Sequence, residues 1–427
     1  MHRRAILLLA CAGLGSAQPR GGGGVHRRAK RPGNDAGVAP RESGALAGCP
    51  AMVVSASWLA ASCRNTSAHT AATGLDATNA IDTRLVHRHH PVWRNFLPWR
   101  GFVTKVSVSD NLTDFMGFVA PRSLYCNPAY MRQPRAHALR ARQCGSYLPA
   151  PVLQRGVELQ TVWPVVSEEY FEYCDVLSAV LDYTEEVNVN GSEAGSRRPF
   201  VFVELGAGYG HWTFTAHKAL MQLAPAAPYR YLMADVVPSL EKAVRNLERL
   251  NGVSPEAATF HVGYIGAHDS AMGEGRAQVR DGALMIKAYS KLWGTGTSDA
   301  DSQAIKRTVS LRSLLEMYSL PACVDMLDID VQGSEYASFR GHQGIFYGTS
   351  SIEVLNSRVR RVHIGTHVGP DFSRQLQNLV ALFQENHWKK VWDFSPGERV
   401  TPWGPVDFGD GVVSFVNQNP SLVCPLK

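Results

Sequence analysis

Three glycines on alternate residues follow a short apolar run that ends in an acidic residue. The run covers residues 200–203, Glu204 follows it, and the glycines are Gly206, Gly208 and Gly210. The apolar run predicts a buried strand, and the glycines predict a tight turn whose backbone lies close to a ligand. Glycine turns also end strands that bind nothing, so the neighbouring residues decide between these two interpretations.

The residues behind the turn indicate the type of ligand. Residues 214–223 have a helical pattern, and a strand, glycine turn and helix in succession bind nucleotide-like cofactors at the carboxyl edge of a parallel sheet. A dinucleotide fingerprint requires its third glycine at the position of His211. The alternate spacing behind an acid instead resembles the cofactor turn of S-adenosylmethionine-dependent methyltransferases.

Two carboxylates have suitable positions for contact with such a cofactor. Glu204, at the end of the first strand, is expected to hold the positive amino group of the methionine part. Asp235 ends a second predicted strand at 229–236, and its carboxylate can accept hydrogen bonds from both ribose hydroxyls. The other interpretation of Asp235 is a solvated surface acid. The glycines would let the backbone pass close under the cofactor.

A second group of polar residues follows the predicted strands at 324–331 and 359–364. Methyl transfer to a hydroxyl requires a group that takes the hydroxyl proton, and Asp330 and His367 are the best-placed acid–base candidates. Asp330 can equally cap the turn that follows its strand. The other side chains expected on the acceptor side are Gln332, Glu335 and Thr366.

A metal-assisted route is the alternative to this acid–base pair. Asp328, Asp330 and His367 offer oxygen and imidazole ligands for Mg²⁺. Nothing in the sequence requires a metal, so a metal-free base is favoured. His363 lies inside a strand and is expected to be a core histidine with its hydrogen bonds satisfied.

Strands and helices alternate along the rest of the domain, which predicts a doubly wound α/β sandwich. A closing antiparallel pair is expected at 389–394 and 412–416, with Asp410-Gly411 as the turn into its second strand. Residues 267–307 are rich in Gly, Ser and Asp and are expected to form a long insertion. The remaining predicted elements are helices at 168–181, 239–250, 311–317 and 373–386 and a strand at 260–265.

Five segments in the same order resemble the FkbM-type methyltransferases. They are Glu169-Tyr-Phe-Glu172, the glycine turn with Trp212, the Asp-Val-Gln-Gly-Ser-Glu signature at 330–335, Val362-His-Ile-Gly-Thr-His367 and Asp410-Gly-Val-Val-Ser-Phe-Val-Asn417. The resemblance covers residues 165–420 and implies a class I methyltransferase fold (Rossmann-like). Two departures are Asp328, where many members carry lysine, and Asp235-Val-Val-Pro238, where many have Glu-Pro.

The chain before this domain differs in composition. Residues 1–17 resemble a secretory signal peptide, with basic residues before an apolar run and small residues at the cleavage site. Residues 18–43 are expected to be a disordered, basic, Gly/Pro-rich linker, and 44–164 a loop-rich extension that matches no known family. Residues 1–43 carry eight basic and two acidic side chains, which accounts for the net charge of +6. The rest is neutral and gives no indication of nucleic-acid binding.

A secretory route makes disulfides possible among the eight cysteines. Cys11 is removed with the leader, so the remaining seven cannot all pair. Cys49 with Cys63, and Cys126 with Cys144, are local candidates, whereas Cys174 is expected to be a buried free thiol. No cysteine or histidine group has zinc spacing.

The sequence therefore predicts an S-adenosylmethionine-dependent O-methyltransferase. The resemblance implies that its acceptor is a small molecule or glycan, with the methyl group going to a hydroxyl of a sugar or glycoconjugate. The alternative is a secreted non-catalytic carbohydrate-binding protein that retains the fold. The expected location is the secretory pathway or the exterior, with a plastid reached through the secretory route as a variant. No membrane-spanning segment is expected in the mature chain.

Overall fold

The computed structural model describes an α/β domain and parts of the chain before it. The described residues are 89–98, 100–103, 111–121, 124, 157–160, 166–189, 198–271, 307–331, 335, 344–346, 350–367 and 373–424. The predicted leader and linker, most of the 267–307 insertion, Gln332 and the candidate cysteine pairs Cys49–Cys63 and Cys126–Cys144 lie outside these residues.

A seven-stranded sheet forms the centre of the domain. In spatial order its strands are β13 (Trp388–Phe394), β16 (Val412–Asn417), β12 (Arg361–Gly365), β11 (Met326–Ile329), β5 (Phe200–Leu205), β6 (Tyr229–Asp235) and β7 (Ala258–Val262). Strand β16 is antiparallel to both of its neighbours, and the other pairings in the sheet are parallel. The expected doubly wound sandwich with a closing antiparallel pair is confirmed.

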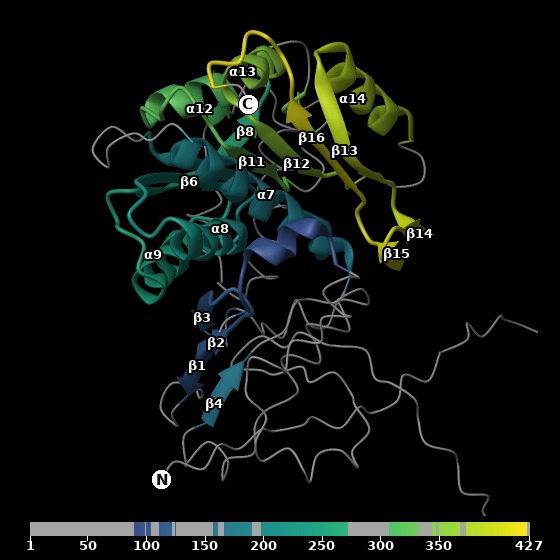
Figure 1. The fold of residues 1–427 in the computed structure, drawn as a ribbon. Helices are drawn as coiled ribbons and strands as arrows, with labels where there is room; N and C mark the ends of the chain where they lie inside the picture. The colour runs from purple at the N-terminus through teal and green to yellow at the C-terminus, as the bar shows by residue number, and fades with distance from the viewer. Residues whose placement is uncertain are drawn as a thin grey trace, which may run out of the picture.

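Two layers of helices cover the sheet (Figure 1). Helices α7 (Glu168–Val189), α8 (His211–Leu223) and α9 (Leu240–Asn251) lie on one face, and α12 (Leu311–Met317), α13 (Ser350–Arg358) and α14 (Ser373–Glu385) on the other. Strand β5 is buried along its whole length, with Phe200 and Phe202 in the core on the α7 face and Val201 and Val203 in the core on the opposite face. A strand covered on both faces needs a continuous apolar run, as the sequence has here.

Part of the region before residue 165 packs into the same core. The 3-10 helix η3 (Pro91–Asn95) places Trp93 against Tyr170 of α7, with the ring centroids 5.5 Å apart. Asn251, at the end of α9, pairs through its side chain with the backbone N–H and C=O of Val119 at 2.8 Å each. These described segments therefore stabilise the α7 face of the domain.

Smaller strand pairs surround the main sheet. They are β1 (Arg100–Val103) with β4 (Val157–Gln160), β2 (Asn111–Thr113) with β3 (Val119–Pro121), β14 (Gly397–Thr401) with β15 (Gly404–Phe408), and β8 (Tyr264–Gly266) and β9 (Ser270–Ala271) on either side of β10 (Arg307–Ser310). Glu168 holds the chain after β15, because its carboxylate accepts the backbone N–H groups of residues 409–411 at 2.7–3.0 Å.

A disulfide joins Cys323, before β11, to Cys424, after β16. The two cysteines are 101 residues apart in the sequence. This disulfide was not predicted, because the spacing of cysteines suggests only pairs that are close in sequence. Cys174 is a buried free thiol, as expected. Among the described residues, no helix is both long and apolar enough to cross a membrane.

Candidate functional site

The glycine turn lies where the sheet order reverses, between β5 and the start of α8. Gly206, Gly208 and Gly210 have φ angles of +80°, +53° and +81°, which favour glycine strongly over other residues. A Cβ on Gly206 would lie 1.9 Å from the carbonyl oxygen of Asp330, and one on Gly210 would lie 2.6 Å from Sδ of Met233. These two glycines are therefore also required for the turn to pack against the rest of the protein.

Asp235, at the end of β6, is joined to this turn. Its carboxylate accepts the N–H of Gly208 at 2.8 Å through one oxygen and the N–H of Val237 at 2.8 Å through the other. Burial raises the pKa of Asp235 to about 6, although the backbone hydrogen bonds act in the opposite direction. Asp235 is partly buried, so it is not simply a solvated surface acid.

Glu204 has a structural role at the start of α8. Its carboxylate accepts the backbone N–H and the hydroxyl of Thr213, at 2.9 and 2.5 Å, and is 2% exposed. Burial raises the pKa of Glu204 to about 7, against the effect of these hydrogen bonds. Glu204 therefore fixes the start of α8 to the end of β5, and this structural role does not depend on a bound ligand.

Asp330 and His367 meet at the ends of β11 and β12. Nε2 of His367 lies 2.9 Å from Oδ1 of Asp330, and its Nδ1 lies 2.9 Å from Oε1 of Glu335. Burial alone would lower the pKa of His367, but the carboxylates of Glu335 and Asp330 raise it well above its usual value. The imidazole is therefore positively charged near neutral pH, and the Asp330 side chain, 41% exposed, is the more accessible member of the pair.

The backbone around this pair is shaped to hold it. His367 has a φ of +42°, an unfavourable value for a residue with a side chain. A Cβ on Gly365 would lie 3.1 Å from Cε1 of His367 and 3.3 Å from Oδ1 of Asp330, so glycine leaves room for both side chains. Strained positions of this type are frequent at functional sites.

Thr366 contacts the loop before β16. It is fully buried, and its hydroxyl donates to the carbonyl oxygen of Asp410 at 2.7 Å. Its N–H donates to the carbonyl oxygen of Gly411 at 3.0 Å. Thr366 therefore holds the loop before β16 against the end of β12, because its hydroxyl and its N–H both bond that loop, and its place on the acceptor side stays a prediction.

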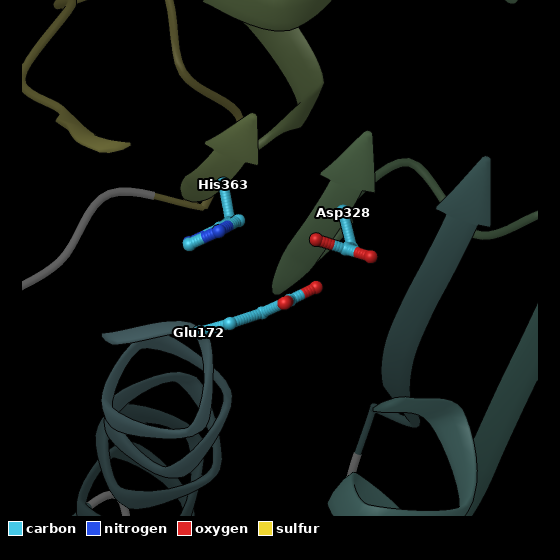
Figure 2. Close-up of side chains that lie close together, drawn as sticks. All are labelled: Glu172, Asp328 and His363. Atoms are coloured by element: carbon cyan, nitrogen blue, oxygen red, sulfur yellow. The ribbon is translucent and has the colours of Figure 1, made fainter. Parts of the chain in front are cut away.

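A third group of side chains was not predicted as a set. Figure 2 shows Glu172 from α7 pointing toward Asp328 of β11 and His363 of β12, with one ligand atom of each within 4.8 Å of the others. In the described part of the chain, Asp328 is therefore grouped with Glu172 and His363, and not with the Asp330–His367 pair. His363 is a buried core histidine, as expected, and its Nδ1 lies 2.7 Å from Oδ2 of Asp175.

Comparisons with known proteins give structural matches only. No family model matches the chain, and no curated protein matches its sequence. The methyltransferase FkbM from Methylobacillus flagellatus KT has a TM-score of 0.29 at 13% identity, over 52% of this chain and 45% of that one. The O-methyltransferase from Bacillus cereus in complex with SAH has a TM-score of 0.27 at 11% identity, over 56% of this chain and 91% of that one.

The precorrin-6y C5,15-methyltransferase from Geobacter metallireducens GS-15 also matches, with a TM-score of 0.27 at 10% identity, over 52% of this chain and 81% of that one. Sequence identities and TM-scores this low do not indicate a function. The fold is assigned from the strand order of the central sheet, and the proposed reaction is argued from the side chains described above.

Proposed function

We propose that this chain is an S-adenosylmethionine-dependent methyltransferase of the FkbM type. The observation that carries the proposal is the hydrogen bond between the N–H of Gly208 and the carboxylate of Asp235. It joins the glycine turn after β5 to the acid at the end of the neighbouring strand, at the switch point of the sheet where ligands of such folds bind. The single reversed strand, β16, agrees with a class I methyltransferase sheet.

The donor set fits this cofactor. A carboxylate has about four lone-pair sites, and the backbone N–H groups of Gly208, Val236 and Val237 occupy up to three of them at Asp235, which leaves a site for a ribose hydroxyl. Glu204 lies at the end of the adjacent strand and supplies negative charge for the amino group of the methionine part. When bound, the cofactor supplies an electrophilic methyl group, and the protein's task is to orient it and the acceptor.

The reaction we infer is transfer to a hydroxyl group. The hydroxyl loses its proton to the Asp330 carboxylate, which is the exposed member of the Asp330–His367 pair. Glu335, fully buried, orients the His367 ring through Nδ1, and the charged ring holds Asp330 in position. The resemblance to FkbM-type enzymes supplies the acceptor class, a hydroxyl of a sugar or glycoconjugate.

We infer further that the protein works in the secretory pathway or outside the cell. The leader-like residues 1–17 support this location. The Cys323–Cys424 disulfide also supports it, because disulfides persist mainly in oxidising compartments. Expression in a secretory host followed by mass spectrometry tests it: the secreted chain should begin near Gln18, and an intact Met1 on a cytosolic protein would contradict it.

A transfer assay tests the proposed activity. The full chain is incubated with methyl-labelled S-adenosylmethionine and a panel of free sugars and glycans, and label in the acceptor is measured. Asp235→Ala should lose transfer, whereas Asp407→Ala, which removes an exposed acid from β15, should retain it. Binding of a glycan by a chain that neither binds the cofactor nor transfers label would support a non-catalytic carbohydrate-binding protein instead.

A further inference from the structure

We propose that Glu172, Asp328 and His363 form a binding site for a divalent metal ion of the Mn²⁺ type. The three side chains come from α7 and from the neighbouring strands β11 and β12, and they point toward a common centre (Figure 2). One ligand atom from each lies within 4.8 Å of the others. This site differs from the Asp330–His367 pair and does not depend on the proposed methyl transfer.

Asp328 gives the strongest indication of a cation site. Its side chain is fully buried, and neither carboxylate oxygen accepts a hydrogen bond from an N–H or hydroxyl group within the described residues. Its neighbour there is the carboxyl group of Glu172, and a buried carboxylate that faces only another acid is costly unless it is neutralised, because buried charges are generally paired or coordinate a metal. Both oxygens of Asp328 are therefore available as ligands in the place where Glu172 and His363 meet.

His363 is oriented as a metal ligand. Its Nδ1 lies 2.7 Å from Oδ2 of Asp175, whose other oxygen accepts the indole N–H of Trp392 at 3.0 Å. Histidine ligands of metals almost always have the second ring nitrogen bonded to a carboxylate or carbonyl group in this way. Because Nδ1 is engaged by Asp175, Nε2 is the ring nitrogen that remains for a metal.

The charges around the cluster also favour a cation. Glu172 and Asp328 bring carboxylate oxygens within 4.8 Å of each other. Two carboxylates at one buried site repel each other unless a proton or a cation lies between them. A divalent ion bound there would neutralise both carboxylates at once.

The ligand set indicates the type of metal. Two carboxylates with one imidazole do not match the thiolate and imidazole sets of structural zinc sites or the all-oxygen sites of calcium. Carboxylates suit Mn²⁺, and imidazole suits first-row transition metals in general. Three protein ligands also leave coordination positions for water or another small oxygen ligand.

Direct titration with Mn²⁺ tests the site. The full chain is stripped with EDTA, dialysed and titrated with MnCl₂, and the free ion is measured by electron paramagnetic resonance. We expect one bound ion per chain. Asp328→Asn and Glu172→Gln should each weaken binding at least as much as the roughly 10–100-fold expected for Asp175→Asn, which removes only the support of the histidine. The matched control, Asp407→Asn, removes an exposed acid and should bind like the parent.

Thermal unfolding of the parent chain provides a second measurement that needs no variant. A site that binds only the folded chain must raise the melting temperature when Mn²⁺ is added. The proposal is overturned if the parent neither takes up Mn²⁺ nor gains stability from it. It is also overturned if Asp328→Asn binds as tightly as Asp407→Asn, because the cluster would then be a carboxyl pair that shares a proton.

Discussion

Nε2 of His367 lies 2.9 Å from Oδ1 of Asp330, across the ends of two neighbouring parallel strands. The carboxylates of Glu335 and Asp330 raise the pKa of His367, so the imidazole is charged, and in the proposed reaction Asp330 is the group that accepts a proton. Asp330→Asn keeps the size of the side chain and should lower methyl transfer by about 10²–10⁴-fold. Cofactor affinity should remain close to that of the parent, as measured by calorimetry.

Asp410 provides the control for this prediction. Its carboxylate lies 3.9 Å from Nε2 of His367 and is 58% exposed, so Asp410→Asn removes a similar charge nearby without removing the 2.9 Å contact. This variant should keep most of its activity. If Asp330→Asn turned over a confirmed acceptor at the parental rate, Asp330 would be a turn cap rather than a base.

Cofactor binding should depend on pH through Asp235. Its pKa is raised to about 6, so the carboxylate is protonated below this pH and ionised above it. An ionised carboxylate is the stronger acceptor for ribose hydroxyls, so affinity should rise between pH 5 and 7 by about tenfold at most per unit of pH. Calorimetric titrations across this range measure the effect.

Asp235→Asn serves as the control in these titrations. It should bind the cofactor more weakly and lose the change centred near pH 6, leaving only the part near pH 7 that Glu204 sets. Equal or tighter binding at pH 5 by the parent would show that Asp235 does not contact the cofactor as an anion.

A buried network of ion pairs lies at the amino ends of the strands and should contribute strongly to the stability of the domain. Asp325 is bonded by Arg198 at 2.7 and 2.8 Å and by Arg360 at 3.1 Å, and Arg360 is 2% exposed. Asp325→Ala leaves the buried Arg360 with only the Glu186 carboxylate and should cost up to about 3–5 kcal/mol in the free energy of unfolding by urea. Asp182→Ala, which breaks the partly exposed pair with Arg361, should cost about 1 kcal/mol or less. Equal losses of unfolding free energy in the two variants would contradict this prediction.

The disulfide should contribute to stability under oxidising conditions. Cys323 and Cys424 close a loop with a sequence separation of 101, for which the chain-entropy model gives about 4.7 kcal/mol. Replacing both by serine should lower the unfolding free energy by about 2–5 kcal/mol, and a reductant should then have no further effect. A parent whose stability does not change on reduction would show that the bond does not form.

The sequence predicted the sheet and the glycine turn better than the contacts of individual side chains. The apolar run of β5 and the glycine turn are local signals, so Glu204, Gly206, Gly208 and Asp235 were expected where they lie. The partner of the Thr366 hydroxyl, the carbonyl oxygen of Asp410, was not predicted, because the position of a residue in a strand does not indicate which neighbour its hydroxyl bonds.

Other features were missed because their causes are long-range or weak in the sequence. The Glu172–Asp328–His363 cluster forms only when α7 packs on two strands more than 150 residues away. An acid inside the buried strand β11 was the available signal for it. The β14–β15 hairpin was missed because its exposed strand carries Glu398, Arg399 and an exposed Val400, which do not alternate cleanly.

Calorimetric titration of S-adenosylmethionine into the full chain tests the central claim most directly, with two glycine variants compared to the parent. Gly208 and Gly252 both have positive φ, 53° and 77°, but Gly252 only ends α9, and a Cβ there would meet nothing within 4 Å. We expect one site per parent chain, unchanged binding by Gly252→Val, and at least tenfold weaker binding, about 1.4 kcal/mol, by Gly208→Val. No binding by the parent, or parental affinity in a folded Gly208→Val variant, would contradict the account.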